Sequence, residues 1–166
     1  NKGLQSNHIL SLLSDQNKQI WIGTYLGGLS KFNFGTKRWK HYLQGEQKDG
    51  NDVRVLFQAE NSAIYAGTNI LWKSTDGGDA WTALGDLTTG VNRRNLPIMG
   101  MAPHDTTLSL DDGIPYYPTL TAVAESPMDP SLLYAGSDDG NFQVSRDGGQ
   151  TWIEASARMP GLPRST

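Results

Sequence analysis

The sequence predicts an all-β fold built from about three to four repeated units, each a four-stranded antiparallel sheet. The 166-residue chain holds 19 glycines and 8 prolines, together with five tryptophans, six tyrosines and four phenylalanines. No long segment repeats its apolar residues at the spacing of a helix, so this composition favours short strands joined by tight turns. The third observation is an internal repeat, which is typical of folds made of stacked units.

One five-residue pattern occurs three times, in the order aliphatic, aromatic, small or aliphatic, glycine, hydroxyl. Its copies are Ile20–Thr24, Ile64–Thr68 and Leu133–Ser137. A short apolar run before each copy predicts a preceding strand; the runs are Ile9–Leu13, Val53–Phe57 and Leu120–Ala124. A tryptophan further along each unit, after a third strand and a turn, predicts the start of a fourth strand; these are Trp39, Trp81 and Trp152.

Units of four short antiparallel strands, with a glycine at the end of the most apolar strand, are typical of β-propeller blades. The glycine is expected where a neighbouring backbone approaches closely, or at a bulge. A β-sandwich with accidental similarity is the alternative, but the motif recurs three times in one order, which favours the propeller. Because propellers close with about 4–8 blades, the sequence predicts an incomplete ring with open blade edges.

We predict that residues 1–166 form one β-propeller segment, which the repeat divides into blades. Blade 1 covers roughly residues 6–45, blade 2 roughly 50–84 and blade 3 roughly 119–156. The spacing of the copies is uneven, which places a long insertion or a degenerate blade at residues 85–118. Long loops of this kind are often functional. Residues 157–166 are predicted to link to a further blade.

Charge and composition exclude several classes of partner. The formal charge is −3, from 14 basic and 17 acidic residues without a run of either sign, so we expect neither nucleic acid nor an anionic membrane as a partner. There are no cysteines, which excludes disulfides and thiolate metal sites. No apolar stretch is long enough to cross a bilayer. The start, Asn1–Leu4, predicts a processed or excerpted chain.

Two turns carry a serine, an aspartate and a glycine pair before a tryptophan. The segment Ser145–Trp152 reads S-x-D-G-G-x-T-W, and Ser74–Trp81 is a weaker copy with Ala80 in place of the threonine. Serine and aspartate oxygens accept backbone hydrogen bonds in such turns, glycine takes positive φ, and tryptophan anchors the hairpin. We therefore predict structural roles, and no catalytic role, for these residues: Ser74, Asp76, Gly78, Trp81, Ser145, Asp147, Gly149, Thr151 and Trp152.

These two turns and four further segments resemble the sequences of a known family of repeat proteins. The segments are Asp86–Thr89, Leu96–Gly100, Thr121–Pro130 and Leu133–Asn141. On this basis residues 51–166 resemble the Asp-box (BNR) repeat propellers of the sortilin-like group, which include bacterial proteins described as glycosyl hydrolase-like. The resemblance extends more distantly to xyloglucanase and sialidase propellers.

The N-terminal part resembles a different group. Residues 3–43 are similar to the sensor propeller repeat of periplasmic portions of two-component regulators, on the segments Gly3–Ile9, Ile20–Thr24 and Gly27–Asn33. This part lacks the S-x-D-G-G turn. Together the two resemblances imply a bacterial protein that is secreted or periplasmic.

The candidate ligand-binding residues lie mainly in the insertion. Asp111 and Asp112, near His104 and Asp105, form its densest group of ionisable side chains and are candidates for binding a cation or sugar hydroxyls, with a solvated turn as the alternative. Trp72 lies outside the repeated tryptophan position and is a candidate for stacking on a sugar.

Other polar positions favour plainer interpretations. The segment Asp138–Asn141 is interpreted as a turn between strands. His8 and His41 have no second ligand at metal-binding spacing, so no metal site and no cofactor are predicted. The seven arginines occupy no recurrent strand-end position, which disfavours sialidase chemistry.

The predicted function is a non-catalytic, secreted or periplasmic β-propeller scaffold that binds a protein or a glycan. One alternative is part of a carbohydrate-active, glycoside hydrolase-like propeller enzyme, whose paired carboxylates would lie in further blades. The second is a structural subunit that assembles through open blade edges. The predicted partners are therefore a protein or glycan ligand, and either further blades of the same polypeptide or other copies of the chain.

Overall fold

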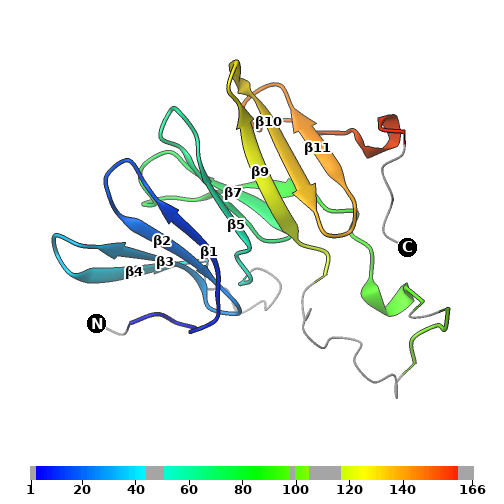
Figure 1. Ribbon diagram of the computed structural model, residues 1–166, viewed down its shortest axis with the longest axis horizontal. Helices are drawn as coiled ribbons and strands as arrows, with labels where there is room; N and C mark the ends of the chain where they lie inside the picture. The colour runs from blue at the N-terminus through cyan, green and yellow to red at the C-terminus, as the bar shows by residue number, and fades with distance from the viewer. Residues whose placement is uncertain (1–2, 44–50, 98–99, 105–116, 161–166) are drawn as a thin grey trace.

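A computed structural model describes residues 3–43, 51–97, 100–104 and 117–160, and within them the chain is all-β. Three four-stranded antiparallel sheets follow one another, each made of consecutive strands (Figure 1). The strands are β1 (Ile9–Ser14), β2 (Ile20–Thr24), β3 (Gly28–Asn33), β4 (Arg38–Tyr42), β5 (Val55–Gln58), β6 (Ile64–Gly67), β7 (Ile70–Ser74), β8 (Thr82–Asp86), β9 (Leu120–Ser126), β10 (Asp129–Ser137), β11 (Phe142–Ser145) and β12 (Ile153–Glu154). The predicted fold, an incomplete propeller of about three to four four-stranded blades, is confirmed, and three such sheets lie in the described residues.

Helical structure is confined, in these described ranges, to two single turns of 3-10 helix, η2 (Arg93–Asn95) and η3 (Ser156–Arg158). Neither they nor any other described helix is long and apolar enough to cross a membrane. The tryptophans expected to open the fourth strands lie there: Trp39 within β4, and Trp81 and Trp152 immediately before β8 and β12.

The first strands of the three sheets lie next to one another, β1 against β5 and β5 against β9. Two equivalent backbone bonds join successive sheets where a second strand ends. The Val53 amide donates to the Thr24 carbonyl at 3.3 Å, and the Leu120 amide donates to the Thr68 carbonyl at 2.7 Å. At both junctions, the threonine at the repeated hydroxyl position therefore accepts a hydrogen bond from the segment that leads into the next blade.

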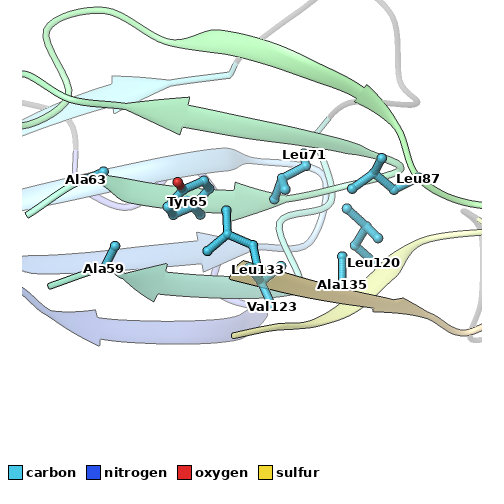
Figure 2. Packing of buried hydrophobic residues seen from close by; sticks show 9 residues of the cluster. All are labelled: Ala59, Ala63, Tyr65, Leu71, Leu87, Leu120, Val123, Leu133 and Ala135. Atoms are coloured by element: carbon cyan, nitrogen blue, oxygen red, sulfur yellow. The ribbon is translucent and has the colours of Figure 1, made fainter. Parts of the chain in front are cut away.

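Two apolar cores fill the spaces between the sheets. The repeated aromatic residue of one blade packs against the aliphatic residues of the next: Trp21 lies with Ile64 and Ala66, and Tyr65 lies with Leu133. Figure 2 shows the second core, with Tyr65, Leu71 and Leu133 gathered between the second and third sheets. Burial of these aromatic side chains is a main source of stability in such a fold.

The repeated glycine has a steric role at the two junctions. A Cβ at Gly23 would collide with the Ser11 hydroxyl of its own sheet and with the Val53 carbonyl of the next blade. One at Gly67 would lie 2.5 Å from Val55 Cγ1 of its own sheet and 3.1 Å from Leu120 Cβ of the next blade. At Gly136, in the third blade, the same Cβ would meet only Ala122 Cβ, at 3.8 Å. The expected close approach therefore occurs at the positions where another blade follows.

The two serine–aspartate turns are held by local hydrogen bonds. We call Ser74–Trp81 the first Asp turn and Ser145–Trp152 the second Asp turn. In the second, the Thr151 hydroxyl and amide donate to the Asp147 carboxylate at 2.5 and 2.8 Å, and the Ser145 hydroxyl donates to it at 2.7 Å. These bonds, that from the Thr151 hydroxyl first, lower the pKa of Asp147 to about 2.

The first Asp turn has the same arrangement with one bond fewer, since Ala80 has no hydroxyl. The Ala80 amide and the Ser74 hydroxyl each donate to Asp76 at 2.9 Å and lower its pKa. In both turns the second glycine has positive φ and donates its amide to the serine hydroxyl. The Asp76 and Asp147 carboxylates thus accept hydrogen bonds from residues of their own turns.

A lysine connects each blade to the Asp turn of the next blade. Lys31 Nζ donates to the Gly77 carbonyl at 2.7 Å, and Lys73 Nζ donates to the Gly148 carbonyl at 3.0 Å. Each ammonium also lies over the repeated aromatic ring of its own blade, Lys31 at 4.8 Å from the Trp21 centroid and Lys73 at 5.4 Å from that of Tyr65. We call this arrangement the lysine bridge; a cation over an aromatic face is favourable in itself.

Candidate functional site

The candidate site lies at the end of the sheets where second strands turn into third strands. Because successive strands are antiparallel, each fourth strand also ends there. The connection from β8 to β9 therefore passes over this end, and Figure 1 shows it beside the turn between β10 and β11. It contains residues 87–119, of which 98–99 and 105–116 lie outside the described residues.

The connection is tied to the third sheet through one buried carboxylate. Asp139, in the β10–β11 turn, is 5% exposed. Its Oδ2 accepts hydrogen bonds from the Thr89 amide at 2.7 Å and the Thr89 hydroxyl at 2.6 Å, and its Oδ1 accepts one from the Ser137 hydroxyl. A turn of the third blade thus fixes the chain leaving the second blade, 50 residues earlier.

Two neighbours of Asp139 extend this attachment. The Thr119 amide and hydroxyl donate to the Asp138 carboxylate at 2.8 and 3.0 Å. The Asn141 side-chain amide donates to the Leu87 carbonyl at 2.8 Å. The Asp138–Asn141 segment is a turn between strands, as predicted, and it also holds both ends of the β8–β9 connection.

A hollow of about 260 Å³ opens beside this turn. Its lining includes the half-buried apolar residues Val91, Leu96 and Tyr117. It also includes the polar residues Asp139 and Asn141 and the exposed Glu154. Such a mixture of apolar surface and a few placed polar groups is typical of binding pockets. It favours a ligand that presents an apolar group next to hydrogen-bond donors or a positive charge.

Helix η2 positions part of this lining. The Asn92 side chain caps it by accepting from the Arg94 amide at 2.9 Å, a usual N-cap arrangement. The Arg93 guanidinium lies 5.5 Å from the centroid of the Tyr117 ring, over its face. This contact joins the early and late parts of the connection on one side of the hollow.

Of the four residues predicted to bind ligand, the structure describes His104 and Trp72, and neither lines the hollow. Asp111 and Asp112, with Asp105, lie outside the described residues. His104 is exposed and does not line the hollow. The Trp72 ring packs against the core between the first two sheets. Their ligand-binding roles remain predictions, and among the described residues no three acidic, histidine or cysteine side chains lie together as metal ligands.

A second hollow, of about 330 Å³, lies between the first sheet and the first Asp turn. Its lysines already have partners: Lys40 pairs with Asp79 at 2.7 Å, and Lys31 forms the lysine bridge. The polar groups of this hollow therefore serve mainly to join two blades. The hollow beside Asp139 is the better candidate because a long connection, and not a second sheet, forms its wall.

We expect the Asp139→Ala change to detach the β8–β9 connection. The change removes the acceptor of the Thr89 amide and hydroxyl, the Ser137 hydroxyl and the Asn141 amide, and an unsatisfied buried partner costs about 1–3 kcal/mol. Hydrogen exchange should show the Thr89 amide losing protection by about ten-fold or more, with little change in the first sheet. The control is Asp139→Asn, which keeps an acceptor oxygen; equal exchange in both variants would contradict the proposed attachment.

Comparison with known proteins agrees with the fold. A family model described as two component regulator propeller matches residues 3–26, which contain β1 and β2. This supports the predicted sensor-type resemblance over part of residues 3–43. No curated protein matches the chain, and the resemblance of residues 51–166 to Asp-box propellers remains a prediction.

Several solved propeller structures are similar in fold. The extracellular domain of BT4673, described as a hybrid two component system of B. thetaiotaomicron, superposes with a TM-score of 0.63 at 16% identity, covering 93% of this chain and 17% of that chain. The corresponding domain of BT3049 from the same organism gives 0.59 at 19% identity, covering 92% and 17%. YCF48 bound to D1 peptide gives 0.59 at 12% identity, covering 94% and 42%. The chain thus spans about a sixth of the first two solved domains.

Proposed function

We propose that this chain is a non-catalytic, secreted or periplasmic β-propeller scaffold that binds a protein ligand at the hollow beside Asp139. The observation that carries the proposal is the construction of that hollow. A long connection is fastened by buried hydrogen bonds to a turn of the third blade, and apolar and polar side chains line the hollow together. A rigid sheet that positions a loop-built pocket is a common arrangement for binding.

The chemistry of the pocket points to a peptide segment with neighbouring apolar and basic side chains. Val91 and Leu96 offer aliphatic surface, and the exposed Glu154 carboxylate lies beside them. YCF48, whose fold is similar, is seen bound to a peptide, and the similar domains of BT4673 and BT3049 are extracellular. Both facts support a binding role outside the cytoplasm.

The test is a selection from a random peptide library, followed by calorimetry on the selected peptides. We expect sequences with lysine or arginine next to an aliphatic or aromatic residue. The Val91→Arg change should weaken their binding by about ten-fold or more, because it fills the hollow and repels the basic side chain. The Glu154→Gln change should weaken binding less and reduce its dependence on salt.

The matched control is Met128→Arg, which adds the same charge at a 90% exposed residue of the β9–β10 turn, at the opposite end of the sheet (Figure 1). It should leave peptide binding unchanged. Selected peptides that bind the Val91→Arg variant as tightly as the original chain would contradict the proposed site. A ligand found only on a glycan array would contradict the protein ligand and favour the glycan alternative.

A further inference from the structure

The hollow between the first sheet and the first Asp turn carries more positive charge than the joining of two blades requires. Its volume is about 330 Å³, and residues of β3 and β4 form much of its lining. Three basic side chains, Lys31, Arg38 and Lys40, line it together with one acidic side chain, Asp79. Because the whole chain has a formal charge of −3, this excess of positive charge is local. We call this space the basic hollow.

The second blade junction shows that a junction forms without the residue at Lys40 being basic. Lys31 and Lys73 make equivalent lysine bridges at the two junctions. On the neighbouring fourth strand, Lys40 lies opposite Lys31, whereas Thr82 lies opposite Lys73. Like charges directly opposite each other on two strands are destabilising. The first junction therefore carries an electrostatic cost that the second junction avoids.

Two more residues of the basic hollow are particular to the first junction. Asp79, the sixth residue of the first Asp turn, corresponds to the uncharged Gln150 of the second. Tyr42 corresponds to Leu84, since a Cβ on the second glycine of the Asp turn would lie 3.2 Å from the Tyr42 hydroxyl at the first junction and 3.0 Å from Leu84 Cδ1 at the second. The second junction thus packs with uncharged or apolar residues where the first has polar ones.

The ion pair across the basic hollow does not account for its charge. Lys40 Nζ lies 2.7 Å from Asp79 Oδ1, but the two side chains are 56% and 77% exposed, and an exposed ion pair adds little stability. Lys31 uses one of its three N–H donors on a carbonyl of the Asp turn. Arg38 is exposed and forms no ion pair with any residue that the structure describes. Donors and positive charge therefore remain for an anionic ligand.

We propose that the basic hollow binds the phosphate or sulfate group of a small polar molecule. Lys31 and Lys40 are cross-strand neighbours, and Arg38, two residues before Lys40, lies on the same face of the sheet. The oxygens of one tetrahedral oxyanion can accept charge-assisted hydrogen bonds from all three side chains. Uncharged hydrogen-bonding side chains complete the lining for the rest of the ligand: Gln19, Asn33 and Thr36.

The size of the hollow limits the ligand to about one sugar ring, since ligand pockets span about 300–1,000 Å³ and this one is near the lower end. The site is independent of the peptide ligand proposed above, because the two hollows share no lining residue. Val91→Arg, which fills the other hollow, should therefore leave binding in the basic hollow unchanged.

The experiment is calorimetric titration of the chain with glucose 6-phosphate and glucose 6-sulfate at low salt, with glucose as the neutral probe. We expect both esters to bind, glucose not to bind, and the affinity for the esters to fall as salt is added. The phosphate ester should bind more tightly, because its charge at pH 7 is about −1.5 to −2; a tighter sulfate ester would instead assign the oxyanion to sulfate. Glucose that binds as tightly as the esters, or no binding of either ester, would overturn the proposal.

Three variants separate this binding role from a role in joining the blades. Arg38→Gln should weaken ester binding by about ten-fold or more, and so should Lys40→Thr, which introduces the residue of the second junction. Asp79→Gln, which also copies the second junction, should instead tighten binding, because it removes a negative charge and releases the Lys40 ammonium. Urea unfolding should show all three variants folded with little change in stability.

The matched control is Arg146→Gln, which removes the same charge from an exposed residue of the second Asp turn. It should leave ester binding unchanged. An Asp79→Gln variant that binds the esters more weakly than the original chain would overturn the proposed site. Equal losses of affinity in Arg38→Gln and Arg146→Gln would also overturn it, because they would show that the esters respond only to the net charge of the chain.

Discussion

Replacing Trp21 with alanine is expected to lower the free energy of unfolding by about 3–5 kcal/mol, the usual cost of truncating a fully buried tryptophan. The ring is 0% exposed and stacks on Tyr42, with centroids 5.6 Å apart. It also donates from Nε1 to the Asp15 carboxylate at 2.9 Å and lies beneath the Lys31 ammonium. The change therefore removes the largest side chain of the core between the first two blades, together with the hydrogen bond to Asp15 Oδ2 and the cation–π contact of Lys31.

Urea unfolding measures this loss directly, and Phe34→Ala is the control. Phe34, an aromatic residue in the turn between β3 and β4 of the same blade, is 56% exposed, so its removal should cost less than about 1 kcal/mol. Trp21→Phe should fall between the two, because it keeps an aromatic ring but loses the hydrogen bond. Equal costs at Trp21 and Phe34 would mean that the first two sheets are not packed as described.

The second large effect is expected at the repeated glycine, and it should differ among the blades. Gly23→Ala places a methyl group against the Val53 carbonyl. Because the backbone must move to relieve this clash, we expect the free energy of unfolding to fall by about 3 kcal/mol, the upper end of the cost of overpacking. Gly67→Ala meets mainly the Val55 side chain and should cost about 1–2 kcal/mol. Gly136→Ala meets no atom closer than 3.8 Å.

The Gly136→Ala variant is the internal control. Its methyl group meets no close neighbour in the folded chain, and alanine gives the unfolded chain fewer conformations than glycine does. The variant should therefore be neutral or stabilise by up to about 1 kcal/mol. The three changes are chemically identical and occur in the same sequence motif, so they differ only in the neighbours of the added methyl group, which come from the facing strand of the same sheet and from the next blade. A similar loss in all three variants, measured by urea unfolding, would contradict a steric role for the glycine, because no atom lies closer than 3.8 Å to a Cβ at Gly136.

The fold could be predicted because its signals are local and repeated. Ile20–Thr24 and its two copies mark buried strands, and the serine, aspartate and glycines of the second Asp turn bond to one another within four residues along the chain. Local chemistry of this kind can be deduced from sequence spacing alone. The steric role of the glycines at positions 23 and 67 followed from the same repeat.

The candidate site could not be predicted in the same way, because its contacts join distant segments. Asp139 looks like an ordinary turn residue beside Gly140, and nothing in the sequence pairs it with Thr89, 50 residues earlier. The available signal was slight: among the three repeats, only the third follows its hydroxyl residue with two aspartates. The lysine bridge was missed for the same reason, since Lys73 and Gly148 are 75 residues apart.

The lysine bridge also determines which part of the chain is a transferable module. The first blade contributes only the lysine and the third only the Asp turn, whereas the second blade carries both, in Lys73 and the segment Ser74–Trp81. A tandem duplication of the second blade would therefore give every new junction its own ammonium and its own carbonyl acceptor. Duplication of the first or the third blade would create a junction without this bond, so the middle unit is the one from which longer propellers of this type can grow by gene duplication.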